Sequence, residues 1–325
     1  MESVLRSSAA RAAFAPAQRR AVIDIGTNSI KLLVADVRGR HVDPVHEESR
    51  QTRLGKNFYD TRRLQPEAVA CTAEAVWEFA EIARERQAET IRVIATSAAR
   101  DAVNKDDLIS TIERASGLKV EIISGEQEAA WVFQGVTANS DLARRPLLLL
   151  DVGGGSTEFI LGRGAEKHFA ESFPLGTVRL LEKFPHSNPP KRIEFERSRD
   201  WVENVLRREV RPKLEPPLRR EGNGNVQLAG TGGTVSILSR IESGLNRFDR
   251  EEIERTVLSF DRVVAIRKEL WRLPLAKRRE IVGLPKMRAD VILTGVLIYE
   301  IIMREFGFAQ LRVSTRGLRF AAVMD

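Results

Sequence analysis

The chain has 325 residues and a net charge of +7, with 42% apolar and 30% charged residues. A chain of this length and composition is expected to fold into about two domains, which excludes wholesale disorder. Its single cysteine, Cys71, excludes an intramolecular disulfide, and with four scattered histidines it gives no Cys/His zinc spacing. We therefore expect a protein of a reducing compartment, the cytoplasm.

Neither a membrane span nor an export signal is predicted. The longest apolar run, residues 291–302, is shorter than the ~20 residues that a bilayer span needs and contains Tyr299 and Glu300. Residues 1–20 contain alanines and arginines but lack the apolar segment of a signal peptide, so we interpret them as a disordered extension. No membrane partner is expected.

The positive charge is concentrated in two stretches of the second half. Residues 191–220 hold 10 basic and 6 acidic side chains, and residues 261–290 hold 9 and 4. This excess favours a polyanionic partner, and solvated helix faces in an arginine-rich chain are the alternative interpretation.

In the first half of the chain, predicted strands alternate with predicted helices. Residues 21–26 form a buried strand that ends in a glycine turn, and residues 29–37 form the returning strand. Further strands are predicted at 91–96 and 118–123, and helices at 66–87, 106–115 and 124–133. Ser124 and Gln127 form a capping box at the start of the last helix.

The second half repeats this alternation after a polar junction at residues 141–146. Residues 147–161 are predicted as strand, turn and strand. Further strands are predicted at 168–173, 226–230 and 311–315, and a loop at 215–225. Helices are predicted at 177–184, 193–214, 260–273, 288–306 and 317–323, and one more follows the glycine turn at 230–234 and ends at residue 241.

One turn pattern occurs twice, in DIGTNS at residues 24–29 and in DVGGGS at residues 151–156. Glycines let backbone N–H groups converge on an anion, hydroxyls add donors, and the aspartate can hold a divalent cation that bridges phosphates. Two such turns that face each other would clamp a phosphate chain across a cleft between two similar lobes. Ordinary turn chemistry is the alternative for each turn alone.

A third glycine turn, GTGGT at residues 230–234, follows a strand and precedes a helix. It can bind an anion at the helix N-terminus, or it can serve close strand–helix packing. The chain has no P-loop, Val235 excludes a dinucleotide fingerprint, and Glu158 excludes a nucleophile elbow.

Two further segments carry charged residues that suit a phosphate site. Glu126 and Glu128 lie in the first turn of a predicted helix, where the helix dipole favours acids and where one of them could activate water. Spacing alone does not choose between them. Arg100 follows a predicted strand and can bind a phosphate or pair with Asp101.

Seven segments agree with one protein family in type and order. They are AVIDIGTNSIKLLV, ATSAARDAVN, EIISGEQEAAWVFQGV, LLLLDVGGGSTEFI, FPLGTVRL, LAGTGGTVS and GLPKMRADVILTGVLI. Together they resemble the Ppx/GppA phosphatase family of exopolyphosphatases and guanosine pentaphosphate phosphohydrolases over residues 20–320. The resemblance implies an α/β fold of two duplicated actin-like lobes, RNase H-like as in the acetate and sugar kinase superfamily, with an interlobe cleft. Lobe I would span residues 21–140 and lobe II residues 141–309, with residues 310–325 packing back on lobe I.

The resemblance also implies roles for residues at the cleft. The family's catalytic glutamate directly precedes an alanine, which corresponds to Glu128 here. The turn aspartates Asp24 and Asp151 would hold Mg²⁺ or Mn²⁺. The phosphate-binding positions carried over are Gly26, Thr27, Asn28, Ser29, Lys31, Arg100, Gly153, Gly154, Gly155, Ser156, Thr157, Gly232, Gly233 and Thr234.

The expected activity is that of an exopolyphosphatase, with a homodimer implied and no nucleic-acid partner. Water activated by Glu128 would attack the terminal phosphoanhydride of polyphosphate in line, with Mg²⁺ assistance, and release orthophosphate. Guanosine pentaphosphate is the alternative substrate for the same site. An ATP-binding kinase or chaperone-like ATPase would explain the turns but not the Glu128 motif, and a non-catalytic polyphosphate or nucleotide sensor is a further alternative.

The chain departs from the family pattern near its end. The family's closing G-L-R-E-G stretch is here Gly317-Leu318-Arg319-Phe320-Ala321, so an acid and a glycine are replaced. The helical HD-type module of longer members is not expected after residue 325. A polyphosphate tail would then leave along the two basic stretches.

Overall fold

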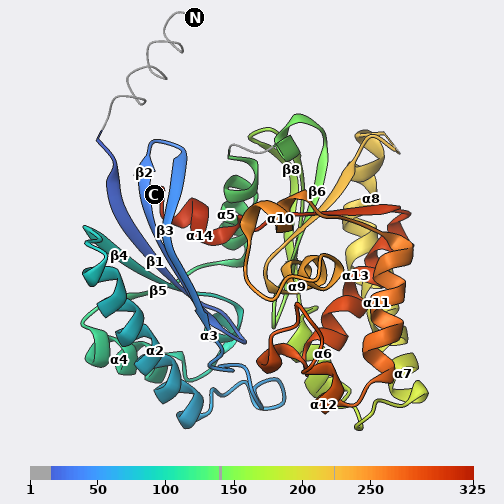
Figure 1. Cartoon of the computed structure of the whole chain (residues 1–325), viewed down its shortest axis with the longest axis horizontal. Helices are drawn as coiled ribbons and strands as arrows, with labels where there is room; N and C mark the ends of the chain where they lie inside the picture. Colours follow the sequence, from blue (N-terminus) through green and yellow to red (C-terminus); the bar gives the residue numbers. More distant parts are fainter. Residues whose placement is uncertain (1–15, 139–140, 223) are drawn as a thin grey trace, which may run out of the picture.

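Two β-sheets lie beside each other in the computed structural model, which describes residues 16–138, 141–222 and 224–325 (Figure 1). The first has strand order β3-β2-β1-β4-β5, and the second has order β10-β11-β9-β6-β7-β8. We call the part built on the five-stranded sheet the first lobe and the part built on the six-stranded sheet the second lobe.

The two sheets share one topology. In the first lobe, β1 (Gln18–Ile25), β2 (Ile30–Arg38) and β3 (His41–Arg50) are antiparallel, and β4 (Thr90–Ala95) and β5 (Val120–Ile122) continue the sheet in parallel. In the second lobe, β6 (Leu147–Val152), β7 (Thr157–Arg163) and β8 (Glu166–Phe173) are antiparallel, β9 (Gln227–Thr231) and β11 (Gln310–Val313) are parallel to β6, and β10 (Val257–Ser259) closes the edge. The repeated turn therefore joins equivalent strands, β1 to β2 and β6 to β7.

Helices cover the sheets on both sides. Those before residue 145 are α2 (Pro66–Glu85), α3 (Ser97–Asp101), α4 (Lys105–Ser116), α5 (Gly125–Thr137) and the 3₁₀ turn η1 (Asp141–Arg144). Those after it are α6 (Thr177–Lys183), α7 (Arg192–Val205), the π-helical turn η2 (Leu206–Val210), α8 (Arg211–Arg220), α9 (Gly233–Glu242), α10 (Arg250–Arg255), α11 (Phe260–Arg272), α12 (Leu275–Arg278), the 3₁₀ turn η3 (Lys286–Arg288), α13 (Ile292–Phe306) and α14 (Leu318–Ala322). No helix in the described residues is long and apolar enough to span a bilayer.

Strand periodicity divides the core into three layers. In β6, Leu148 and Leu150 pack with α13, whereas Leu147 and Leu149 face the other way toward α5. Successive strand side chains point to opposite faces, so the uninterrupted leucine run marks a strand that is buried on both faces.

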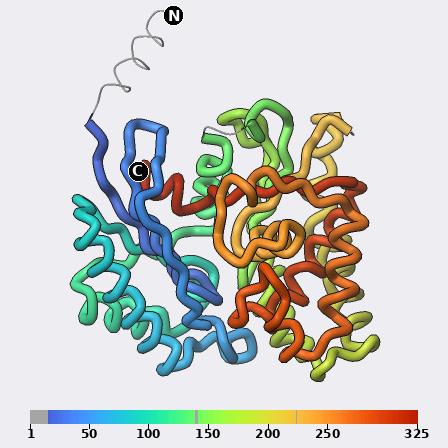
Figure 2. Tube along the Cα trace, in the orientation of Figure 1, coloured from blue at the N-terminus to red at the C-terminus, as the bar shows by residue number. Residues whose placement is uncertain are grey.

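Helices α5 and α14 form the middle layer between the sheets. Val22 of β1 and Leu149 of β6 belong to the same apolar cluster as Val132 of α5 and Ala321 of α14. Figure 2 shows the C-terminal segment passing from the second lobe to the strands of the first. Strand β11 stays in the second sheet, whereas α14 packs on α5 and β1.

Several predicted elements differ from the observed ones. Strand β1 begins at Gln18, inside the extension predicted for residues 1–20, of which residues 1–15 lie outside the described residues. The predicted loop at 215–225 is wrong up to Arg220, because α8 continues through Pro216 and Pro217. Burial of Leu214 and packing of Leu218 against the same core offset the unfavourable prolines.

Strand β3 has no counterpart among the predicted elements, because its sequence HVDPVHEESR is polar and contains a proline. Pro44 lies where the β2–β3 register shifts, on an edge strand, and this is where a sheet tolerates proline. The predicted helix 193–214 is also interrupted, by the π-helical turn at 206–210.

Candidate active site

A cavity of about 110 Å³ lies between the lobes, where the three glycine turns meet. Residues 26–29, 153–156 and 231–234 all line it. The first two turns close with the same backbone bond, from Gly26 N to Ser29 O at 3.1 Å and from Gly153 N to Ser156 O at 2.9 Å. The repeated sequence therefore forms two equivalent turns that face one cavity.

The lobes touch around this cavity. Arg288 donates to Ser29 Oγ at 3.0 Å, and Arg53 pairs with Asp290 at 2.8 Å. A Cβ added to Gly155 would lie 2.4 Å from Ser97 Oγ of the other lobe. This close approach favours glycine at position 155 and leaves the turns near enough to hold one ligand together.

Four buried carboxyl groups line the cavity. Asp24 and Asp151 occupy equivalent positions near the ends of β1 and β6, Glu158 pairs in register with Asp151, and Glu128 lies in the first turn of α5. Burial raises the pKa of each, and Lys31 opposes the rise for both aspartates. The pKa of Glu158 is raised to about 7, by burial first and by Asp151 second.

Glu128 is held by an arginine behind it. Arg100 donates to Glu128 Oε2 at 2.9 Å and to the carbonyl of Ile123 at 3.2 Å. Burial and the neighbouring Glu158 raise the pKa of Glu128 well above its usual range, and Arg100 lowers it. Ser124 caps α5 by accepting from Gln127 N at 3.1 Å, which fixes the first helical turn toward the cavity.

Cations face these carboxyl groups from three elements. Lys31 is the register partner of Asp24 across the β1–β2 pair, and burial lowers its pKa while Asp24 raises it. Burial also lowers the pKa of Arg288 to about 10. Arg319 of α14 donates to the carbonyl of Leu32 at 2.7 Å and lines the same cavity.

The predicted phosphate-binding residues meet at the cavity with two exceptions. Arg100 contacts Glu128 and does not line the cavity, and Thr157 is buried with its hydroxyl donated to the carbonyl of Leu175. The assignment of Thr157 as a phosphate ligand is therefore corrected. It lies between Ser156 and Glu158 on β7, and strand alternation turns it away from the side that both of these face.

Three charged residues of the cavity lining, Glu158, Arg288 and Arg319, were not among the predicted site residues. Glu158 was detectable in principle, because it lies two residues after Ser156 on one strand face. Arg288 and Arg319 come from distant segments, and no local pattern marks them. Phe320, which replaces the expected acid, also lines the cavity, with the Arg250 guanidinium 4.9 Å from its ring centroid.

Asp24 and Asp151 fit a magnesium ion that takes most of its ligands from water and substrate phosphate. No group of three or more His, Cys, Asp or Glu side chains within the described ranges could hold a metal. Among the described residues, Asp24 Oδ1 is nevertheless buried and has no hydrogen-bond partner. Asp24 and Asp151 both line the cavity. Mg²⁺ commonly uses one or two carboxylates and completes its shell with water and substrate phosphate.

Two lobes of one topology, with glycine turns, buried acids and cations around an interlobe cavity, define an actin-like protein whose site suits phosphoryl groups. A sequence profile of the Ppx/GppA phosphatase family matches residues 33–324, and the chain belongs to this family. The predicted resemblance and fold class are thereby confirmed.

Relatives and solved structures agree with this assignment. Exopolyphosphatase 2 of Mycobacterium tuberculosis is 36% identical over 318 residues, covering 92% of this chain and 96% of that protein. An exopolyphosphatase structure from Cytophaga hutchinsonii matches with a TM-score of 0.83 and 28% identity over 94% of this chain and 96% of that one. The Ppx/GppA protein of Aquifex aeolicus matches with a TM-score of 0.76 and 28% identity over 95% and 97%.

Proposed function

We propose that this chain is an exopolyphosphatase, which hydrolyses the terminal phosphoanhydride of inorganic polyphosphate and releases orthophosphate. The observation that carries the proposal is the buried Glu128 at a cavity formed by three glycine turns. The exopolyphosphatase named above, with which the chain aligns over almost its whole length, supports the substrate class.

The terminal phosphoryl group would lie against the turns at Gly26 and Gly153, whose backbone N–H groups and neighbouring hydroxyls suit its oxygens. Asn28 Nδ2 is buried and has no acceptor among the described atoms, so it is available to a phosphate oxygen. Lys31 and Arg288 add positive charge at the same wall. Phosphoryl transfer depends mainly on positioning and electrostatic stabilisation, and these groups supply both.

Glu128 would orient a water molecule and accept its proton. Its raised pKa makes the carboxylate a stronger base than an exposed glutamate, and Arg100 fixes its direction. Asp24 and Asp151 would hold Mg²⁺, which supplies positive charge to the bridging oxygens when bound. Hydrolysis in this arrangement needs no covalent enzyme intermediate.

A matched pair of variants in one helical turn tests the role of Glu128. Glu128→Gln should reduce Mg²⁺-dependent phosphate release from polyphosphate by about 10²–10⁴-fold while polyphosphate binding persists. Glu126→Gln is the control, since Glu126 is exposed on the same turn. Full turnover in Glu128→Gln would overturn the assignment. Phosphate release without any acceptor substrate separates hydrolysis from kinase activity and from a non-catalytic sensor.

A further inference from the structure

The glycine turn of the second lobe rests on the start of α6. The backbone carbonyls of Gly153 and Gly154 accept hydrogen bonds from the backbone N–H groups of residues 177–179, at 2.8 to 3.1 Å. The next carbonyl, that of Gly155, accepts from the side chain of Arg179, whose Nε lies 2.8 Å away. Three successive carbonyl groups of the turn therefore point toward α6, and the last of them is held by a charged side chain.

The other side of the same peptide groups carries hydrogen-bond donors. In a trans peptide the N–H points away from the C=O, so the N–H groups of residues 154–156 point away from α6. Within the described part of the chain, these three N–H groups have no acceptor, and residues 153–156 line the interlobe cavity. Successive free N–H groups of this kind form a concave surface that suits phosphate oxygens.

Arg179 is in turn held by the first lobe. Its guanidinium carbon lies 4.2 Å from the centroid of the Tyr59 ring, and its Nη2 lies 3.6 Å from Asp101 Oδ2 of α3. Glu182, on the same helix, accepts from Asn57 N at 2.5 Å and from Tyr59 N at 3.5 Å, which fixes the segment that carries the ring. Arg179 therefore joins the turn of one lobe to two elements of the other.

A purely stabilising ion pair does not explain these contacts. Asp101 is 40% exposed, and ion pairs at such exposure contribute little to stability. Arg179 itself does not line the cavity, so it acts on a ligand only through the turn. A planar guanidinium can stack on a ring and still direct its N–H groups at acceptors in its own plane. The contacts of Arg179 use both properties.

From this geometry we infer that Arg179 is a positioning residue, which fixes the peptide between Gly155 and Ser156 so that its N–H is aimed at the transferring phosphoryl group. The contacts with Tyr59 and Asp101 make this alignment depend on closure of the lobes. The inference rests on the proposed function, since it names the residue that aligns the turn for that reaction. A charged donor on the carbonyl also polarises the peptide and strengthens its N–H as a donor. Such preorganised donors act most where charge develops in the transition state.

Steady-state phosphate release from polyphosphate tests this role, with kcat and KM determined separately. Arg179→Met should lower kcat about tenfold or more and change KM little, because a misaligned donor is lost mainly in the transition state. Arg179→Lys should recover little of the kcat, since an ammonium group lacks the planar shape that stacks and bonds at once. Tyr59→Leu should lower kcat more than Tyr59→Phe, which keeps the ring.

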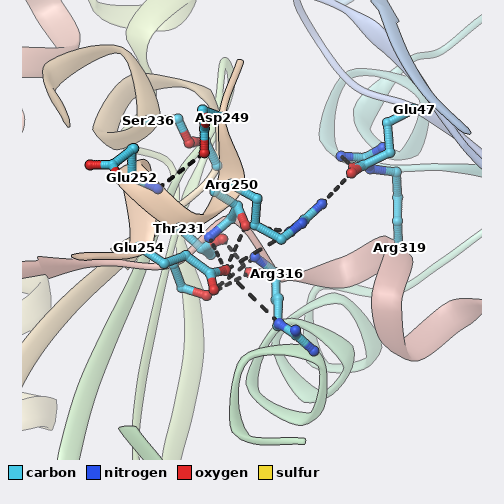
Figure 3. A network of polar contacts seen from close by, with 12 residues as sticks. Glu47, Thr231, Ser236, Asp249, Arg250, Glu252, Glu254, Arg316 and Arg319 are labelled. Carbon is cyan, nitrogen blue, oxygen red and sulfur yellow. Dashed lines mark hydrogen bonds and ion pairs between the residues drawn. The ribbon is translucent and has the colours of Figure 1, made fainter. Parts of the chain in front are cut away.

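Arg250 offers a matched control, because it also bridges the lobes but donates to no glycine turn. It is ion-paired with Glu47 of β3 (Figure 3). Arg250→Met therefore removes an interlobe arginine contact and leaves the turn in place, and thermal unfolding of each variant reports whether it is folded. An unchanged kcat in Arg179→Met would overturn the inference. An equal fall of kcat in Arg250→Met would also overturn it, because the effect would then belong to lobe contact in general.

Two further readouts separate alignment from folding. Guanidinium chloride at low concentration should restore part of the kcat of Arg179→Ala, compared with the same concentration of sodium chloride, because the side chain that it replaces is 23% exposed. Orthovanadate mimics a phosphoryl group in the transition state, so its Ki should rise in Arg179→Met as kcat falls. No recovery with guanidinium together with an unchanged Ki would overturn the inference.

Failure of the proposed function gives a different result. Absence of phosphate release by the wild type would count against the exopolyphosphatase activity and not against the alignment of the turn. Direct binding of orthovanadate would then decide the role of Arg179. Weaker binding to Arg179→Met than to Arg250→Met would support the inference, and equal binding would overturn it.

Discussion

Replacement of Glu158 by glutamine should stabilise the metal-free protein by an amount that grows as the pH rises from 4.5 to about 7. Glu158 is 1% exposed, and its Oε1 accepts from Ser156 Oγ at 2.9 Å and from Ser172 Oγ at 2.7 Å. Glutamine has the same shape and keeps one carbonyl oxygen that can accept both bonds. Glu158→Gln therefore removes a buried negative charge and little else.

The size of the effect follows from the pKa of Glu158. Burial and Asp151 raise it from 4.5 to about 7, so the folded protein favours the protonated carboxyl. Stability from this group is full below pH 4.5 and declines until the pH passes 7, because the charged form is then tolerated better in the unfolded chain. At 1.36 kcal/mol per pH unit, the loss amounts to about 3 kcal/mol.

The assay is thermal unfolding in chelator between pH 4.5 and pH 8, for the wild type and the variant. The variant should match the wild type at the acidic end and unfold at increasingly higher temperature as the pH rises. Glu166→Gln is the control, since the Glu166 side chain on neighbouring β8 is 87% exposed. A stability gain that is independent of pH, or an equal pH-dependent gain in the control, would refute the reasoning.

Three other changes test packing and lobe closure. In the wild type, Arg267 donates hydrogen bonds of 2.6 and 3.0 Å to the largely buried Glu300. Arg267→Met leaves this carboxylate without a partner and should lower the free energy of unfolding by about 3 kcal/mol in denaturant titration. A double variant that also carries Glu300→Leu should recover most of the loss. Gly135→Ala would place a Cβ 2.1 Å from the carbonyl oxygen of Gly317, so separation of α5 and α14 should cost about 1–3 kcal/mol in the same assay, and an unchanged midpoint would contradict that contact. Gly155→Ala would place a Cβ 2.4 Å from Ser97 Oγ of the facing lobe. Because this would hold the two lobes apart at the cavity, phosphate release should fall while the thermal midpoint changes little. Undiminished turnover would show that close contact of the lobes at this turn is not needed.

Local patterns in the sequence were sufficient for the elements that carry the turns. Apolar strands that end in Asp24 and Asp151, each followed by a glycine turn, predicted two equivalent strand–turn–strand units, and the sheets have that duplicated topology. The Ser124 cap likewise predicted the start of α5, because a side-chain cap needs only its own first helical turn. Strand β3 escaped prediction, since its pairing with β2 compensates for a polar sequence.

For the site itself, the sequence determined the chemistry and the tertiary structure determined which residues take part. The motifs alone predicted the glycine turns and both aspartates as a phosphate site, and the family resemblance predicted Glu128 rather than Glu126 as the catalytic glutamate. Packing of the two lobes decided that Arg288 and Arg319 join them, whereas strand alternation within β7 turns Thr157 away. Lobe packing also formed a cavity of about 460 Å³ beside the first, which combines residues of β3, α9 and the segment around Met287. The physical reason is that turn geometry and strand alternation are local properties, whereas burial, and with it charge pairing and pKa, depends on surfaces brought together from distant parts of the chain.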